Sequence, residues 1–324
     1  MIEVNHLTKY FAEHMAVNDI SFSVDRGEVL GFLGPNAAGK STTMRMITGF
    51  LPPTSGTAVI GGRDIIQNSL RARRKIGYLP ENAPAYPDMT VSGFLGFIAG
   101  IRGFFGETRR KRIEQTLERC FLADVRHQTI STLSKGFKQR VCFAQSILHD
   151  PEYLIMDEPT DGLDPNQKYE VRAMIREMAQ DKTIILSTHI LEEVEQVCSR
   201  AIIISNGRIV ADDSPERLRE RSELHGAVRL TVRKQVGLDL MQLISDMPEL
   251  DRSEMLSEGE STQTVRLFPK KGVLLEEEGA DRIFRQLFEK GFSVDTFFME
   301  KGRLDEVFRM VTQPSSTPAN PMQP

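Results

Sequence analysis

The sequence predicts an α/β fold whose core is a mostly parallel β-sheet covered by helices, with antiparallel strands added to it. In the first two-thirds of the chain, short apolar runs rich in Ile, Leu and Val alternate with helical patterns, which is typical of parallel strands buried on both faces. The predicted buried strands are residues 29–33, 153–156, 183–187 and 201–205, and the predicted helices are residues 39–48, 167–179 and 191–198. Residues 2–8 and 20–24 alternate apolar with polar side chains and are predicted to form the antiparallel strands.

The character of the sequence changes twice along the chain, and these changes predict its domains. Residues from about 85 to 149 have helical periodicity and are predicted to form a helical subdomain within a first domain, residues 1–222. The basic run Arg109-Arg110-Lys111-Arg112 in this segment is interpreted as a solvated helix face.

A second, small α+β domain is predicted over residues 225–313, and the order of its elements suggests a ferredoxin-like arrangement. Its predicted strands are residues 227–232, 262–267 and 293–299, and its predicted helices are residues 238–247, 280–289 and 304–311. Residues 314–324 have no apolar pattern and are predicted to be a disordered tail.

Composition narrows the class of protein and its partners. A net charge of −4 over 324 residues does not favour a nucleic-acid partner, because such proteins usually carry a basic surface. The three cysteines are odd in number and far apart, which favours reduced core thiols in a cytoplasm. We expect no signal peptide, and no stretch approaches the ~20 apolar residues that span a bilayer, since Arg102 interrupts the best candidate at residues 93–101.

A phosphate-binding loop directly follows the predicted strand 29–33. It consists of Gly34, Pro35, Asn36, Ala37, Ala38, Gly39, Lys40, Ser41 and Thr42, which matches G-x-x-x-x-G-K-[ST] between a strand and a helix. In this motif the backbone N–H groups surround a polyphosphate, the lysine reaches the β- and γ-phosphates, and the serine hydroxyl binds Mg²⁺. A chance glycine-rich turn is disfavoured because motif and context agree, so the sequence predicts a P-loop NTPase core that binds a nucleoside triphosphate.

Two acids and a histidine end later strands of the same predicted sheet. Asp157 follows the apolar run 153–156, where a strand-end carboxylate can support Mg²⁺, and Glu158 is suited to polarising an attacking water. His189 ends the next buried strand, and a role at the γ-phosphate or in orienting Glu158 is favoured over a purely structural one.

With these motifs in place, the chain resembles the nucleotide-binding subunit of an ATP-binding cassette (ABC) transporter. The resemblance covers roughly the first two-thirds and also includes the signature segment 133–140 and the acidic turn 160–165, in the family's order. It implies that Ser134 and Gly136 cap the γ-phosphate of an ATP held by a second subunit, and that Asp164 couples the two sites. It also implies that Phe11 stacks on adenine, although simple core packing is an equal alternative.

The sequence departs from the family pattern at four positions. Ala37 replaces a loop glycine, which should fit if its φ is negative. Lys135 and Phe137 replace signature residues, and Glu81 stands where a glutamine near Mg²⁺ and the permease is usual. These departures and the C-terminal domain resemble an export-type subgroup with a separate permease, which includes polysaccharide, drug and gliding-motility exporters.

The resemblance therefore implies an ATPase that uses ATP and Mg²⁺. Two subunits, expected to be a homodimer, would close on ATP and drive an integral membrane permease from the cytoplasmic face of the membrane, with Phe94, Phe97, Phe104 and Phe105 as a candidate contact surface. Two alternatives remain at this point: a soluble cassette ATPase acting in translation or DNA repair, and a non-hydrolysing module that uses ATP only to dimerise.

Overall fold

A computed structural model describes residues 1–81, 85–270 and 277–313, and it divides into two compact units. Unit 1 is Met1–Pro215 with Val311–Pro324, and unit 2 is Glu216–Met310. The predicted disordered tail, residues 314–324, lies outside the described residues.

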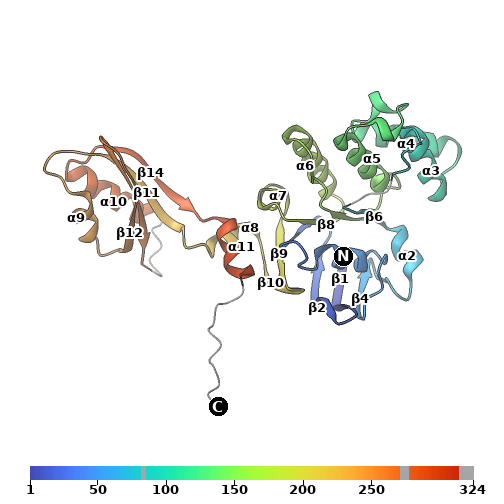
Figure 1. Ribbon diagram of the computed structural model, residues 1–324, viewed down its shortest axis with the longest axis horizontal. Helices are drawn as coiled ribbons and strands as arrows, with labels where there is room; N and C mark the ends of the chain where they lie inside the picture. Colours follow the sequence, from blue (N-terminus) through green and yellow to red (C-terminus); the bar gives the residue numbers. More distant parts are fainter. Residues whose placement is uncertain (82–84, 271–276, 314–324) are drawn as a thin grey trace, which may run out of the picture. The chain divides into compact units, whose positions relative to one another are not determined.

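The core of unit 1 is a six-stranded, mostly parallel sheet (Figure 1). Its strand order is β10-β9-β3-β8-β7-β6, formed by β3 (Val29–Leu33), β6 (Ile76–Leu79), β7 (Tyr153–Asp157), β8 (Thr183–Thr188), β9 (Arg200–Ser205) and β10 (Arg208–Asp213). Only the β9–β10 pair is antiparallel among the pairings described in this sheet. The α/β prediction and its four buried strands are confirmed.

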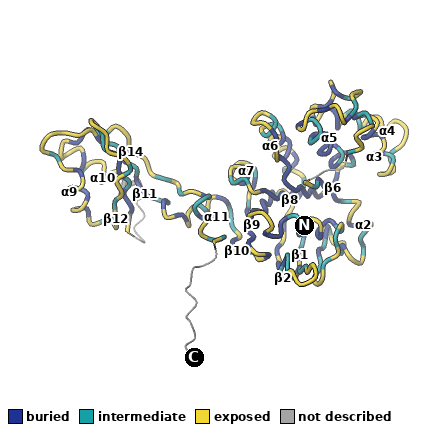
Figure 2. The backbone as a smooth tube through the Cα atoms, in the orientation of Figure 1, coloured by how far each residue is buried: buried dark blue, intermediate teal, exposed yellow. Residues whose placement is uncertain are grey.

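A second, antiparallel sheet of unit 1 contains the start of the chain. Its order is β2-β1-β4-β5, formed by β1 (Ile2–Phe11), β2 (His14–Val24), β4 (Ser55–Ile60) and β5 (Arg63–Asp64). Helix α1 (Lys40–Ile47) contacts strands of both sheets, and its Met44, Met46 and Ile47 join one buried apolar cluster with residues of β1, β2 and β3. In Figure 2 the colour changes along β1 and β2, because buried residues are interspersed with exposed ones.

Helices make up the rest of unit 1. They are α2 (Ser69–Arg74), α3 (Val91–Ile101), α4 (Gly106–Arg119), α5 (Lys135–Ile147), α6 (Pro165–Ala179), α7 (Leu191–Val197) and the start of α8 (Pro215–Glu220), with short 3-10 turns at Ala123–Val125 and Ile130–Thr132. Between β6 and β7 the described residues form α3, α4, the two turns and α5, which agrees with the helical subdomain expected there. Arg109, Arg110 and Lys111 are exposed on α4, whereas Arg112 is half-buried and lies 4.4 Å from the centre of the Phe104 ring.

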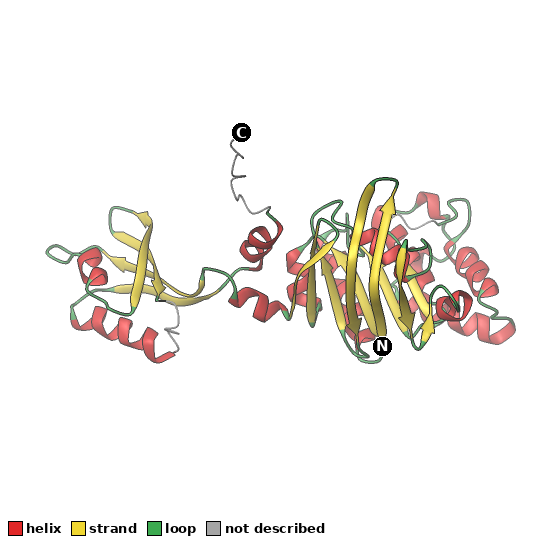
Figure 3. Cartoon of the chain, turned by 90° about the horizontal axis from the view of Figure 1, so that it is seen from below, coloured by secondary structure: helices red, strands yellow, loops and turns green. Residues whose placement is uncertain are grey.

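Unit 2 has the β-α-β-β-α-β order of the ferredoxin-like motif, as the sequence suggested. Its antiparallel sheet has the order β12-β13-β11-β14, formed by β11 (His225–Arg233), β12 (Leu250–Glu258), β13 (Thr262–Pro269) and β14 (Val294–Lys301). The helices α9 (Leu240–Ser245) and α10 (Glu277–Glu289) lie beside this sheet (Figure 3), and their side chains share a buried apolar cluster with it. Helix α11 (Leu304–Thr312) follows β14.

The sequence analysis missed five short or polar strands: β4, β5, β6, β10 and β12. Strand β12 lies at the edge of its sheet, and most of its residues are polar and exposed, so its sequence resembles that of a loop. Strand β10 had a usable signal, because Asn206-Gly207 joins it to β9 and both residues have the positive φ of a hairpin turn.

All three cysteines are free and buried, as predicted. Burial raises the pKa of Cys142 to about 11, which keeps this thiol protonated and unreactive near neutral pH. Among the residues that the structure describes, none of the helices combines the length and the apolar character needed to cross a bilayer.

His149 connects the end of α5 to strand β6. Its Nε2 lies 3.0 Å from the Ile76 carbonyl oxygen and therefore carries the proton, while Nδ1 is buried without a partner. Burial, followed by the nearby Arg102 charge, lowers the pKa of His149 from 6.5 to about 4. The unfolded chain thus binds more protons between these two pH values, so stability is complete above pH 6.5 and falls as the pH drops towards 4.

Because unfolded His149 takes up a proton that folded His149 does not, we expect the free energy of unfolding to fall by about 2 kcal/mol when the pH is lowered from 7 to 5. The variant His149→Gln, which keeps a side-chain donor but does not titrate, should lose this part of the pH dependence. Urea unfolding at each pH, monitored by hydrogen exchange of the amides in α5 and β6, would measure this pH dependence. The control is His127→Gln, which replaces an exposed histidine. An equal pH dependence in His149→Gln and the parent would contradict the assignment.

Candidate active site

A cleft of about 670 Å³ lies over the phosphate loop in unit 1. Of the predicted site residues, those lining it are Phe11, Asn36, Ala37, Gly39, Lys40, Ser41, Thr42, Glu81, Glu158 and His189. Its wall also includes His14, Ala16 and Asp161, which the sequence analysis did not assign to the site. Residues from distant parts of the sequence therefore meet in one place.

The phosphate loop holds Lys40 against its own backbone. The Lys40 ammonium donates to the carbonyl oxygens of Gly34 at 2.8 Å and Pro35 at 3.2 Å, and the residue is only 6% exposed. Gly39 begins α1 at φ +107, and a Cβ there would lie 2.6 Å from the Ala16 carbonyl oxygen. The tight turn that presents Lys40 thus requires glycine at this position.

The condition under which Ala37 would fit without strain, a negative φ, is not met. Ala37 has φ +63, in the left-handed region where a Cβ crowds the backbone and costs roughly 1–2 kcal/mol. The loop keeps the shape that a glycine would adopt freely, and the rest of the motif holds the alanine in it. Sequence spacing alone could not reveal this, because φ is set by the complete turn.

Asp157 is fully buried at the end of β7 beside the phosphate loop. Its Oδ1 accepts hydrogen bonds from the Ser41 hydroxyl at 3.1 Å and from the Ser187 hydroxyl. Its Oδ2 is buried with no partner. A buried carboxylate oxygen without a donor is costly, so this atom is available for a cation.

Glu158 lies between Lys40 and His189. Its Oε1 is 3.7 Å from the Lys40 ammonium nitrogen, and its Oε2 is 3.0 Å from His189 Nδ1. Glu158 is 8% exposed and has φ +51, and its N–H donates to both the carbonyl and the hydroxyl of Ser187. The structure thus brings together the three residues predicted as catalytic.

Ser187 was missed by the sequence analysis. Its hydroxyl contacts Asp157 and Glu158, so one buried side chain aligns both acids. The available signal was a polar residue in an apolar strand, two positions before His189.

Phe11 is not a core residue. It is 47% exposed on the cleft wall, and the Lys9 ammonium lies 5.3 Å from its ring centre. Core packing, one of the two interpretations of this aromatic, is therefore excluded.

Glu81 also faces the cleft and is exposed. Its charge and that of Asp157 act with burial to raise the pKa of nearby Tyr78 to about 12, with burial as the main cause. Within the described part of the chain, no group of three or more His, Cys, Asp or Glu side chains is placed to hold a metal ion.

Seven predicted site residues are not among the described residues that line this cleft. Four of them adjoin it in the phosphate loop or at the end of β7: Gly34, Pro35, Ala38 and Asp157. The other three belong to the signature segment and the acidic turn: Ser134, Gly136 and Asp164. Ser134 caps α5, and its hydroxyl accepts the Phe137 N–H. Asp164 caps α6 in a reciprocal pair with Gln167.

The signature segment packs against the acidic turn of its own chain. A Cβ on Gly136 would lie 2.2 Å from the Gln167 side-chain amide, so a larger residue would displace this amide where α5 meets α6. Lys135 forms an exposed ion pair with Asp161 at 3.4 Å.

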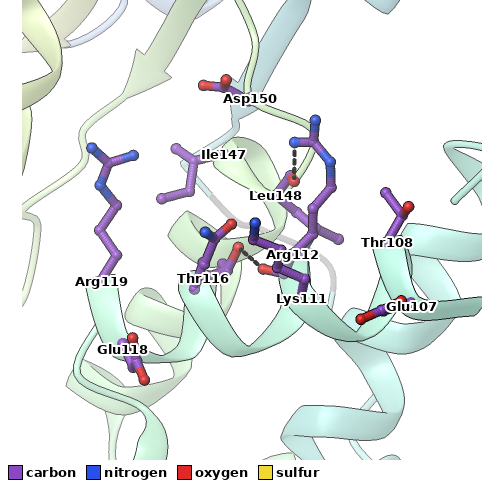
Figure 4. Close-up of a pocket in the computed structure, with 11 residues that line it drawn as sticks. Glu107, Thr108, Lys111, Arg112, Thr116, Glu118, Arg119, Ile147, Leu148 and Asp150 are labelled. Carbon is purple, nitrogen blue, oxygen red and sulfur yellow. Dashed lines mark hydrogen bonds between the residues drawn. The ribbon is translucent and has the colours of Figure 1, made fainter.

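A larger cleft of about 1050 Å³ lies elsewhere, between α4 and the end of α5 (Figure 4). Three of its charged groups have partners within the chain: Arg112 donates to the Leu148 carbonyl at 3.4 Å, and Arg119 and Asp150 pair with Glu177 and Lys182. It contains none of the predicted site residues. The smaller cleft over the phosphate loop is therefore the candidate active site.

Comparison with known proteins identifies the family. A family model described as "ABC transporter" matches residues 17–161. The chain is 38% identical over 223 residues to the uncharacterized ABC transporter ATP-binding protein YxlF of Bacillus subtilis, covering 69% of this chain and 74% of that protein. It is 36% identical over 247 residues to the Nod factor export ATP-binding protein I of Ralstonia nicotianae, covering 76% of this chain and 73% of that protein.

A solved structure agrees with both relatives. The structure described as an ATP-binding subunit of an ABC transporter matches with a TM-score of 0.63 and 31% identity, over 68% of this chain and 92% of that one. The chain therefore belongs to the family of ABC transporter ATP-binding proteins.

Proposed function

We propose that this chain hydrolyses ATP to power a separate membrane permease. The observation that carries the proposal is the arrangement at the mouth of the phosphate loop, where buried Glu158 lies 3.7 Å from buried Lys40 and 3.0 Å from exposed His189. A non-hydrolysing module would have no use for an acid and a histidine positioned in this way. A soluble cassette acting on ribosomes or DNA is not favoured, because the relatives are named as transporter and export subunits.

Each residue of the site has a distinct task in this proposal. Lys40, now satisfied by two loop carbonyls, would transfer its hydrogen bonds to the β- and γ-phosphates, which are charged and therefore stronger acceptors. Glu158 would take a proton from the attacking water as general base, and His189 would hold Glu158 in place and contact the γ-phosphate. Phe11, exposed on the cleft wall, would stack on adenine.

The donor set also fits Mg²⁺. The unpartnered Oδ2 of Asp157 and the Ser41 hydroxyl are oxygen ligands beside the phosphate loop, and Glu81 offers a third oxygen group on the cleft wall. When bound with ATP, the ion would neutralise charge on the phosphates during phosphoryl transfer.

The placement of the signature segment supports a dimer. Ser134 and Gly136 begin α5 but are not among the described residues that line the cleft of their own chain. The N-terminus of a helix attracts phosphate, so this segment would complete the site of a second subunit. Because one chain carries both the phosphate loop and the signature, a homodimer is sufficient, with Asp164 near the seam that joins the two copies.

The partner proposal rests on the helical subdomain and on the relatives. Phe97 and Phe105 are 42% and 70% exposed and could contact a permease, whereas Phe94 is 1% exposed and belongs to the core. Export is the proposed direction, because one relative is named for export, and the proposed location is the cytoplasmic face of the membrane. Residues 1–222 would form the ATPase domain and residues 225–313 an accessory domain.

Glu158→Gln and Lys40→Ala should separate ATP cleavage from ATP binding. We expect Glu158→Gln to bind ATP within a few-fold of the parent but to release phosphate about 10²–10⁴ times more slowly, because the general base is lost. Lys40→Ala should weaken ATP binding by about 10–100-fold, since a charged hydrogen bond contributes about 1.5–3 kcal/mol. Phosphate release and a fluorescence binding titration measure the two effects.

Two matched variants control for charge loss alone. Glu152→Gln and Lys75→Ala break an exposed ion pair beside the opposite end of β7 and should leave both measurements unchanged. Parental hydrolysis by Glu158→Gln would show that Glu158 is not the base, and undiminished ATP affinity in Lys40→Ala would refute the role of Lys40.

ATP should convert the Glu158→Gln chain from monomer to dimer, because the nucleotide is bound but not cleaved. Adding Ser134→Arg should keep the chain monomeric while its ATP affinity stays within a few-fold, since Ser134 serves the opposite site. Light scattering after size-exclusion chromatography gives the mass. Ser131→Arg, an exposed change three residues earlier, should not prevent the dimer. An ATP dimer that survives Ser134→Arg would exclude the proposed seam.

The chain isolated from its native cells should co-purify with a polytopic membrane protein. Replacing exposed Phe97 and Phe105 by Ser should reduce that recovery several-fold without changing ATP binding, because apolar contact area would be lost. Mass spectrometry of the affinity-purified material identifies the partner. Recovery with ribosomes in place of a membrane protein would support the soluble alternative.

A further inference from the structure

Glu193 is a buried acid to which the proposed reaction gives no task. It lies in the first turn of α7 and is 3% exposed. Both of its carboxylate oxygens accept hydrogen bonds from buried hydroxyls: Oε1 from Thr160, and Oε2 from Thr188 at 2.8 Å.

The two threonines place Glu193 next to the chemistry. Thr160 is two residues beyond Glu158, and Thr188 directly precedes His189, so each belongs to one of the two loops that meet at the Glu158–His189 contact. Both threonines are almost fully buried, at 2% and 0% exposure. The carboxylate of Glu193 therefore joins the loop after β7 to the end of β8.

Burying the Glu193 carboxylate costs free energy that an apolar side chain would not. Burial raises the pKa of Glu193, and the negative charge of Glu158 acts in the same direction, whereas the Thr188 hydroxyl, Arg172 and Lys168 oppose them. An apolar side chain would fill the same space without this desolvation cost. The useful property of the carboxylate is that it holds two hydroxyl donors at once.

Glu158 also needs external constraint. Its φ of +51 is unfavourable for a residue with a Cβ, and such a conformation persists only where the surroundings hold it. Ser187 holds the Glu158 N–H from one side, and Glu193 holds Thr160 on the other.

We propose that Glu193 is a positioning residue for ATP hydrolysis: by bridging Thr160 and Thr188 it fixes Glu158 and His189 relative to each other. This inference rests on the proposed function. It assigns Glu193 no contact with the nucleotide. It should therefore influence the rate of cleavage and leave nucleotide affinity nearly unchanged, since Lys40 and the phosphate loop lie on other elements.

The test compares three variants of the full chain, with phosphate release and ATP binding measured on each. We expect Glu193→Ala to lower kcat about 10–100-fold with the Kd for ATP within about three-fold, because small misplacements of catalytic groups cost up to about 10²-fold. Glu193→Gln should keep kcat within about five-fold, because its amide oxygen accepts from one threonine and its NH₂ donates to the other. Glu192→Ala, the exposed neighbour that pairs with Arg172, is the control and should match the parent.

A further pair of variants covers the case in which Glu193→Ala does not fold. Thr188→Val keeps the shape of the side chain but removes the donor, and it should lower kcat while ATP affinity is retained. The double variant Thr188→Val with Glu193→Gln should lower kcat by less than the product of the two separate fold-losses, since both substitutions act on the hydrogen bond between Glu193 and Thr188.

Several results would overturn the inference. These are parental kcat in Glu193→Ala or Thr188→Val, a loss of ATP affinity equal to the loss of kcat, or a Glu193→Gln variant as slow as Glu193→Ala. A parent chain that releases no phosphate would instead overturn the proposed function, and this inference with it.

Discussion

The arrangement of unit 1 depends on charges buried at the carboxyl ends of parallel strands. Lys40, Asp157 and Glu158 are each less than 10% exposed and lie after β3 and at the end of β7. Charges that are so poorly hydrated are stable only with partners, and here loop carbonyls, the hydroxyls of Ser41 and Ser187, and His189 supply them. The buried Oδ2 of Asp157 has no hydrogen-bond partner, and the proposed Mg²⁺ site uses this atom.

Two strained backbone positions lie close to the same charges. Ala37, in the phosphate loop three residues before Lys40, and Glu158, directly after Asp157, both have positive φ. Strained residues are retained where surrounding contacts fix them. In unit 1 these contacts come from the packed strand ends and from buried hydroxyls. The loops are thus preorganised for a polyphosphate before one arrives, which reduces the conformational entropy lost on binding.

Outside the cleft, the signature segment and the acidic turn are joined to each other by contacts within the chain. The signature segment is tied to the acidic turn by Lys135–Asp161 and by the close contact of Gly136 with Gln167. Asp161 lines the cleft, so a movement of the turn would reach both the cleft and the start of α5. Unit 2 has a ferredoxin-like sheet and an apolar core to which none of the ATPase motifs contributes.

The sequence by itself determined the chemistry-bearing motifs and the buried strands, because phosphate loops and doubly buried strands need fixed residue types at fixed spacing. It placed Lys40, Asp157, Glu158 and His189 at strand ends and predicted both the α/β core and the small α+β domain. Only the tertiary structure decided the rest. The φ of Ala37, the exposure of Phe11, and the roles of Ser187 and Glu193 depend on which distant segments pack together, and no local pattern encodes that. Strands such as β12 were missed for the same reason: an edge strand is defined by its hydrogen-bonding neighbour as much as by its own residues.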